Sequence, residues 1–288
     1  MVLTREWLPL NPVRVRALGT VAYVGLDHFD AVTAGRLCGA VARLKAEIGP
    51  GRLSGLILDL RGNPGGLVIQ AVAVAGAFLG RGEILRLVGR GPDDVERFAS
   101  DGAGGGLIDG VPMIVLVDGD TASAAEIVAA ALQDHRRATV IGTRTYGKGA
   151  VQTTYAHRDG RGLRLTTAWM VTPAGRRLEG NGIVPDRVVI QAGATEGGAG
   201  DVERLPSPPG GGGALRDGVV EDAGLTPAHD SQLAAGLREL GAAASTGAAG
   251  AAPARGFDLP QGSSRCTAGE CPVRRGQRPH RSRDGAAP

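Results

Sequence analysis

A serine and a lysine separated by 25 positions have neighbours that suit a catalytic pair. Ser123 begins Ser-Ala-Ala-Glu shortly after an apolar run, and Lys148 lies in Gly-Lys-Gly just before a strand-like stretch. A serine hydroxyl becomes a nucleophile when a nearby base takes its proton, and a lysine amine acts as that base only where burial lowers its pKa. The two segments therefore predict acyl-transfer chemistry.

The surroundings of Ser123 also suit stabilisation of an oxyanion. The serine lies where a predicted strand meets a predicted helix, and the free N–H groups of the first helical turn point into the same space. Such groups bind the oxyanion that forms when a carbonyl is attacked. Gly65 and Gly66, in a turn after another strand, can supply a further N–H because no side chain blocks close approach of a substrate.

Each of these residues also has a purely structural interpretation. Ser123 and Glu126 have the spacing of a capping box, in which each side chain satisfies a backbone donor. Lys148 fits an exposed lysine in a glycine turn. A histidine base is another alternative, since Ser-His-Asp triads are the commoner arrangement, but neither His28 nor His135 has a motif that places it beside the serine.

Residues 142–149 match the GxxxxGK pattern of a phosphate-binding loop. That loop requires Ser or Thr after the lysine, to hold magnesium, and then a helix whose N-terminus faces the phosphates. Gly149 and a strand-like stretch from Val151 follow here instead. A nucleotide-binding protein is therefore the weaker alternative.

Strand-like and helical patterns alternate through the first 190 residues. Apolar runs of strand length occur at 21–26, 56–60, 84–88, 113–117 and 139–141, and helical spacing at 30–48, 67–79 and 123–132. The polar, glycine-rich residues 89–110 are expected to form a mobile excursion. Residues 151–157 and 163–171 flank a turn and predict a hairpin. This order predicts an α/β domain closed by an antiparallel hairpin.

The composition changes beyond residue 190 to Gly, Ala, Pro and Arg. We expect a single catalytic core, then a linker, and finally a largely disordered basic tail, at 1–190, 191–221 and 243–288. Between linker and tail, residues 222–242 place Leu233, Leu237 and Leu240 on one helical face. That face predicts a helix that docks on the core.

Composition argues against several other classes of protein. The net charge is +3 and aromatic residues make up 3% of the chain, which leaves few platforms for stacking bases, so nucleic acid is not an expected partner. Cys38, Cys266 and Cys271 show neither CxxC spacing nor a histidine cluster, and we expect no metal site or disulfide framework. No apolar run reaches the about 18 residues of a membrane span.

Three linked segments resemble the carboxyl-terminal processing proteases, also called tail-specific proteases, at 58–66, 122–134 and 142–152. Shorter matches follow in order, at 166–168, 172–176 and 182–186. Several motifs in order are far more specific than any one of them. The resemblance extends over about residues 4–190 and implies a crotonase-like spiral of ββα units.

The resemblance also implies roles for individual residues. A nucleophile, a base and a supporting glutamine are implied at Ser123, Lys148 and Gln152. Backbone N–H groups of the oxyanion hole are implied at Ala124 and at Gly65 or Gly66. Glu126 is expected to cap the helix of the nucleophile or to support the site. No cofactor is implied.

We therefore expect a serine endopeptidase that cleaves unfolded polypeptides near apolar C-termini through an acyl-enzyme. In the family a PDZ domain precedes the protease core, and bacterial members carry an export signal and work in the periplasm. Neither feature is recognisable at the start of this sequence, so we expect a fragment, a misassigned start or a minimal version. The resemblance implies the periplasm or cell envelope, whereas a sequence without an export signal suggests the cytoplasm. A catalytically silent peptide-binding module is the main alternative.

Overall fold

The structure, a computed structural model, describes most of the chain up to residue 191 and parts of the remainder. The described residues are 11–102, 106–157, 160–191, 215–216, 219–221, 227–228, 230–245 and 274–275. Their helices are α1 (Thr33–Ile48), α2 (Val68–Leu79), α3 (Ala124–Asp134) and α4 (Ser231–Ser245). None of these helices is long and apolar enough to cross a membrane.

The larger sheet has eight strands in the order β10-β7-β6-β3-β2-β1-β12-β11. These are β1 (Val13–Leu18), β2 (Val21–Leu26), β3 (Gly55–Asp59), β6 (Met113–Val117), β7 (Thr139–Gly142), β10 (Arg187–Val188), β11 (Leu215–Arg216) and β12 (Val219–Glu221). The neighbours β2, β3, β6 and β7 run parallel. Every residue of β3 and β6 is buried, as expected for parallel strands covered on both faces.

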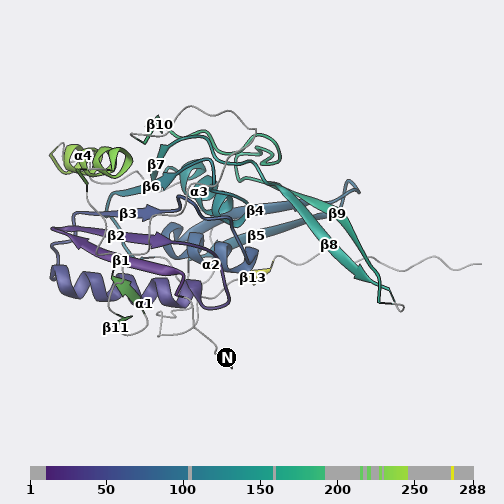
Figure 1. Cartoon of the computed structure of the whole chain (residues 1–288), viewed down its shortest axis with the longest axis horizontal. Helices are drawn as coiled ribbons and strands as arrows, with labels where there is room; N and C mark the ends of the chain where they lie inside the picture. Colours follow the sequence, from purple (N-terminus) through teal and green to yellow (C-terminus); the bar gives the residue numbers. More distant parts are fainter. Residues whose placement is uncertain are drawn as a thin grey trace, which may run out of the picture.

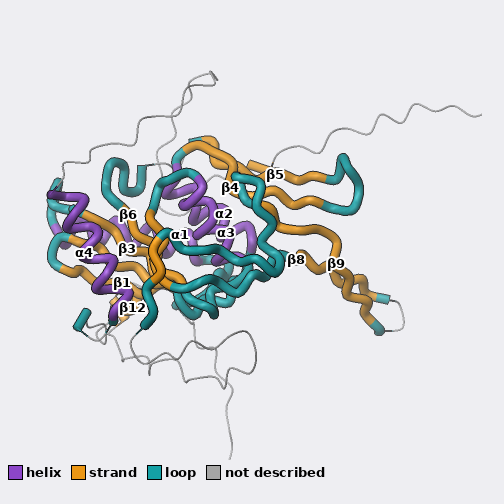
Figure 2. Tube along the Cα trace, turned by 90° about the horizontal axis from the view of Figure 1, so that it is seen from above, coloured by secondary structure: helices purple, strands orange, loops and turns teal. Residues whose placement is uncertain are grey.

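Alternate residues of these central strands face two separate cores. On one face the strands pack against α1, α2 and α3. On the other face α4 covers the sheet, so that it lies opposite the α2 and α3 pair (Figure 2). Its Leu233 and Leu240 pack against Tyr23, Ile57 and Ile114. This helix lies in the segment where the leucine spacing predicts a docked helix.

The second sheet is antiparallel and has the order β13-β5-β4-β9-β8. Its strands are β4 (Arg81–Val88), β5 (Val95–Asp101), β8 (Ala150–Ala156), β9 (Gly162–Val171) and β13 (Arg274–Arg275). The predicted hairpin is confirmed by the pairing of β8 with β9. Figure 1 shows this hairpin extending away from the main body.

The expected α/β fold is confirmed, but the interpretation of residues 89–110 as an excursion is wrong in part, because this segment contains β5. Phe98 is the one buried residue of that strand. A strand with a single residue in the core lacks apolar alternation, and here its backbone pairing with β4 defines it. The expected linker and basic tail lie mostly outside the described residues.

Four loops meet at the carboxyl ends of the central parallel strands. They follow β2, β3, β6 and β7, and they include residues 27–32, 60–67, 118–123 and 143–149. Because these strands are neighbours and point in one direction, their carboxyl ends lie along the same edge of the sheet. Both segments singled out for chemistry therefore reach the same edge.

The end of β7 offers a test of how this edge is built. Gly142 has a φ of 138°, and a Cβ built there would lie 1.8 Å from the carbonyl oxygen of Val117 in β6. We expect Gly142→Ala to lower the free energy of unfolding by about 3 kcal/mol. The added methyl group would clash with the backbone of β6, and a buried strand cannot shift far enough to make room. Urea denaturation measures the change.

Gly175→Ala is the matched control, because Gly175 has a φ of 83° but nothing lies within 4 Å of its added Cβ. The left-handed conformation alone should cost about 1 kcal/mol. Equal losses of stability in the two variants would show that the contact with Val117 is not what requires glycine.

Candidate active site

Ser123 occupies a sharp turn between β6 and α3. Its φ and ψ are 56° and −115°, a conformation that costs a residue with a side chain about 1–3 kcal/mol. It is partly exposed, whereas the residues that follow it in α3 are buried from Ala124 to Leu132. A strained turn from strand to helix is how other hydrolases present a nucleophilic serine. The local geometry therefore suits the predicted nucleophile.

The backbone beside Ser123 offers hydrogen-bond donors. In the described part of the chain, neither the Ala124 N–H nor the Gly66 N–H donates a hydrogen bond. The Gly65 N–H is donated to Asn63 Oδ1 at 2.9 Å. A Cβ on Gly65 would lie 2.9 Å from Ala124 N and from Ser123 Cβ. The glycine turn thus lies directly against the serine, and Gly66 is the glycine whose N–H is available.

One buried carboxylate joins the serine turn to the lysine loop. Glu126 is 0% exposed. Its Oε2 accepts the N–H of Ser123 at 2.8 Å and the N–H of Lys148 at 2.9 Å. Its Oε1 accepts the N–H of Gly147 at 2.8 Å and the hydroxyl of Thr145 at 2.5 Å. The backbones of the two predicted dyad residues therefore share a single oxygen atom.

These contacts combine the two expectations for Glu126. The bond to the Ser123 N–H is the one that a capping-box glutamate makes at the start of a helix. The bonds to Gly147 and Lys148 come from 21 and 22 residues further along the chain. The carboxylate is thus a helix cap and also the link between two loops.

A second carboxylate holds the other side of the lysine loop. Glu179 Oε2 accepts the N–H of Gly149 at 2.7 Å and the N–H of Ala150 at 2.8 Å. Gly149 must be glycine, because a Cβ would lie 2.4 Å from the Glu179 nitrogen. Sequence reasoning missed Glu179, since no pattern around a single glutamate 30 residues away indicates this contact.

The structure does not join the side chains of the predicted dyad. Lys148 is exposed, and its Nζ makes no hydrogen bond or ion pair with any described residue. Gln152 is exposed on β8, opposite Thr166 and next to a register shift after Val151. The backbone of the lysine is fixed beside the serine, but the amine itself is turned toward solvent.

The geometry does not support the two alternatives to a lysine base, a phosphate-binding loop and a histidine base. Lys148 leads into β8, so the helix that a phosphate-binding loop requires does not follow it. His28 lies 3.7 Å from Asp30, and His135 contacts the carbonyl oxygen of Glu83 at 2.7 Å. Neither histidine bonds to Ser123 among the described contacts.

The glycine turn is fastened to the segment that precedes the serine. The Ala122 N–H donates to the Asn63 carbonyl at 2.9 Å. The Gly62 N–H donates to Asp118 Oδ1 at 3.0 Å, and the same oxygen accepts the Thr121 hydroxyl at 3.0 Å. Burial raises the pKa of the Asp118 carboxyl, and these hydrogen bonds only partly offset that effect. These bonds connect the glycine turn to the loop that carries Ser123.

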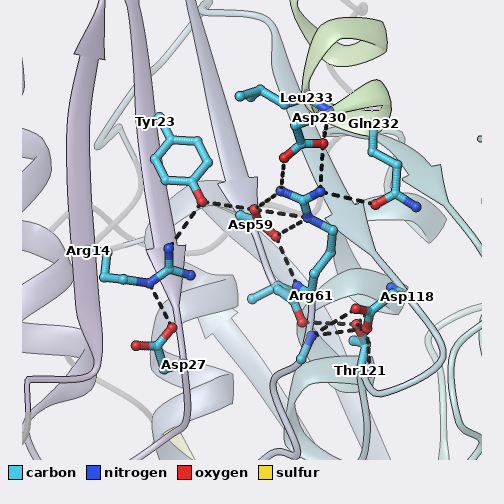
Figure 3. Close-up of polar contacts among 12 residues, drawn as sticks. Arg14, Tyr23, Asp27, Asp59, Arg61, Asp118, Thr121, Asp230, Gln232 and Leu233 are labelled. Carbon is cyan, nitrogen blue, oxygen red and sulfur yellow. Dashed lines mark hydrogen bonds and ion pairs between the residues drawn. The ribbon is translucent and has the colours of Figure 1, made fainter. Parts of the chain in front are cut away.

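A buried ion pair lies at the start of the turn (Figure 3). Asp59, at the end of β3, is paired with Arg61 and accepts the Tyr23 hydroxyl at 2.9 Å. Burial favours a raised pKa for Asp59, but the Arg61 guanidinium and its hydrogen bonds outweigh burial and hold that pKa below its ordinary value. Sequence reasoning missed this pair, although two charges around the end of an apolar strand were a visible signal.

Known proteins match most of this region. Residues 20–189 match the model of peptidase family S41. The carboxy-terminal-processing protease of Bartonella bacilliformis is 47% identical over 189 residues, which cover 66% of this chain and 43% of that protein. The carboxyl-terminal-processing protease of Synechocystis sp. is 37% identical over 194 residues, which cover 66% and 44%. The chain thus spans less than half the length of these curated relatives.

Solved structures agree with the sequence matches. The photosystem II D1 C-terminal processing protease shares 31% sequence identity with a TM-score of 0.57, over 65% of this chain and 50% of that one. An S41 protease from Bacteroides fragilis, at 18% identity and a TM-score of 0.52, shares the fold over 65% and 52%. Since the family model covers more than half of the sequence, this chain belongs to peptidase family S41.

Proposed function

We propose that this protein is a serine endopeptidase that cleaves polypeptides near their C-termini, with Ser123 as the nucleophile. The observation that supports this most directly is the strained turn at Ser123, against which the glycine turn packs. Among the described residues, the N–H groups of Ala124 and Gly66 in these two turns donate no hydrogen bond. A strained backbone at a residue suited to nucleophilic attack is a frequent property of active sites. The names of the relatives describe carboxyl-terminal processing, which supports the choice of substrate.

The reaction proceeds in two stages. Ser123 Oγ attacks the scissile carbonyl carbon while its proton passes to Lys148 Nζ, and the new oxyanion accepts hydrogen bonds from Ala124 and Gly66. The C–N bond then breaks, and the leaving amine takes the proton from Lys148. Water attacks the resulting ester with Lys148 again accepting a proton, which returns to Ser123 Oγ as the acid product leaves.

The lysine must lose contact with water before it can act as a base. The Lys148 side chain is exposed in this structure, and contact with water favours the charged form of an amine. A polypeptide that lies across the edge of β8 would cover the side chain and favour its neutral form. Gln152, on the same strand, would then orient the amine by a hydrogen bond.

The exposed lysine also favours a second candidate, a module that binds peptides without cutting them. Within the described part of the second sheet β8 is an edge strand, so its free backbone groups can pair with an extended chain. Such a module would need Ser123 neither as nucleophile nor as partner of Lys148. Binding without new chain ends would identify it.

Removal of either dyad side chain should abolish turnover and leave the fold intact. We expect Ser123→Ala and Lys148→Ala to lower kcat by more than about a thousandfold, since nucleophile and base act as a unit. Mass spectrometry of an unfolded protein with an apolar C-terminus, after incubation with each variant, detects the products.

Arg144→Ala is the control for the lysine variant, because Arg144 is an exposed cation on the same loop. It should cleave as the wild type does. Undiminished cleavage by Lys148→Ala would rule out the dyad. Binding by the wild type without any cleavage would favour the silent module.

The carboxylate of Glu126 should be needed in its ionised form. In Glu126→Gln the amide NH2 must face N–H or O–H donors, because both oxygens of Glu126 accept them. We expect a loss of about 1–3 kcal/mol in unfolding free energy and a fall in kcat of about ten- to a hundredfold. Urea denaturation and steady-state kinetics measure these.

Glu179→Gln is the matched comparison, because one oxygen of Glu179 accepts both of its bonds from Gly149 and Ala150. A glutamine oxygen can keep both, so kcat should change by less than about threefold. Similar changes of kcat in the two variants would show that the number of donors around Glu126 does not explain its importance for the geometry of the site.

A further inference from the structure

The Arg61 guanidinium lies between carboxylates from distant parts of the chain (Figure 3). Its Nε donates to both oxygens of Asp59, at 2.9 and 3.0 Å, and Nη2 donates to Asp59 Oδ2 at 2.5 Å. On the other side Nη2 and Nη1 donate to the two oxygens of Asp230 at 2.7 and 2.8 Å. Nη1 also donates to Gln232 Oε1 at 3.2 Å. All three guanidinium nitrogens are engaged.

The partners on the second side come from the start of α4. Asp230 precedes the helix, and its Oδ1 also accepts the Leu233 N–H at 2.9 Å, as an N-cap does. Gln232 donates from its amide to the Val189 carbonyl at 2.8 Å. When the first turn of α4 docks, the remaining N–H donors of Arg61 therefore gain their partners.

Arg61 also stands at the entrance to the glycine turn. Its own N–H donates to Asp59 Oδ1 at 3.0 Å, and the next N–H, that of Gly62, donates to Asp118. Asn63 follows, and its side chain holds the Gly65 N–H. A shift of the Arg61 backbone would therefore also move Gly62 and Asn63, which determine the position of the Gly66 N–H.

Without α4, both donors of Nη1 and one of Nη2 would lose their partners. The Arg61 side chain is 17% exposed, so little water reaches it in the docked state. Arg61 would keep its ion pair with Asp59, but donors left without partners at such a position are costly, and the side chain would turn toward solvent to satisfy them. The neighbouring backbone would then lose its fixed place.

We propose that Asp230 is a positioning residue for the peptidase reaction. Together with Asp59 it pairs with the Arg61 guanidinium, and it thereby holds residues 61–66, including the Gly66 N–H, beside Ser123. The proposal rests on the proposed function. Asp230 lies outside residues 20–189, which the family model matches. Its contribution therefore comes from a part of the chain that this match does not cover.

The substitution Asp230→Asn is expected to disrupt the pairing of Asp230 with Arg61 while α4 stays docked on the sheet. Asparagine caps helices about as well as aspartate, and Leu233 and Leu240 keep their apolar contacts with the sheet. The asparagine NH2 replaces one acceptor of Arg61 by a donor and removes the negative charge. Glu239→Gln is the matched control, since Glu239 pairs α4 with Arg187 at 3.0 Å, away from Arg61.

The first measurement is steady-state kinetics on an unfolded protein substrate with the full chain. We expect Asp230→Asn to lower kcat by about tenfold, less than the loss of a whole oxyanion donor, with KM within about twofold of the wild type. Glu239→Gln should change neither value by more than about twofold. Equal kcat values in the two variants would overturn the proposal.

The second measurement is amide hydrogen exchange of Gly62, Asn63 and Gly65, whose N–H groups are hydrogen-bonded. Exchange does not depend on turnover. We expect exchange to be at least about tenfold faster in Asp230→Asn than in the wild type and in Glu239→Gln. Unchanged exchange would overturn the positioning role even if activity fell. A wild type that never cleaves, with exchange that responds, would contradict the proposed function and leave the link from Asp230 to the turn established.

Discussion

The burial of the Glu126 carboxylate is the constraint on which the arrangement of this site depends. A carboxylate removed from water costs several kcal/mol unless donors surround it, and no described cation pairs with this one. Its donors are three backbone N–H groups and one hydroxyl, from Ser123 at the start of α3 and from the loop after β7. The charge can therefore be buried only when both segments come together, so folding of the core itself sets Ser123 beside the lysine loop.

Carboxylates fasten backbone N–H groups throughout this edge of the sheet. Asp59 accepts the N–H of Arg61, Asp118 that of Gly62, and Glu179 those of Gly149 and Ala150. Parallel strands bring loops to one edge but do not fix their conformation. The fixed charges do so, because each ionised acceptor makes a strong bond to the amide it meets. Among the described residues the N–H groups of Ala124 and Gly66 donate no hydrogen bond, and they are the proposed donors to the substrate oxygen.

Local patterns predicted the elements that carry the site and left out the contacts that assemble it. The apolar run of β6 followed by Ser123 and Glu126 predicts a helix start, and the hairpin of β8 and β9 is visible in its turn residues. Strand β5 was missed because only Phe98 enters the core. The bonds of Glu179 and Asp230 cannot be predicted from one sequence, because they join residues 30 and 169 positions away. The exposed side chain of Lys148 likewise depends on rotamers that backbone patterns do not determine.

The two halves of the proposed machinery differ in how firmly they are held. Ser123 and the glycine turn are bonded to buried groups on several sides, whereas the exposed Lys148 side chain bonds to no described residue and only its backbone is fixed. A nucleophile must keep its geometry, but a lysine base needs surroundings that disfavour its charge. Those surroundings are incomplete until something covers the edge of β8. The chemistry proposed here would then depend on the bound polypeptide itself, which would displace water from the lysine and present its carbonyl to the serine in the same step.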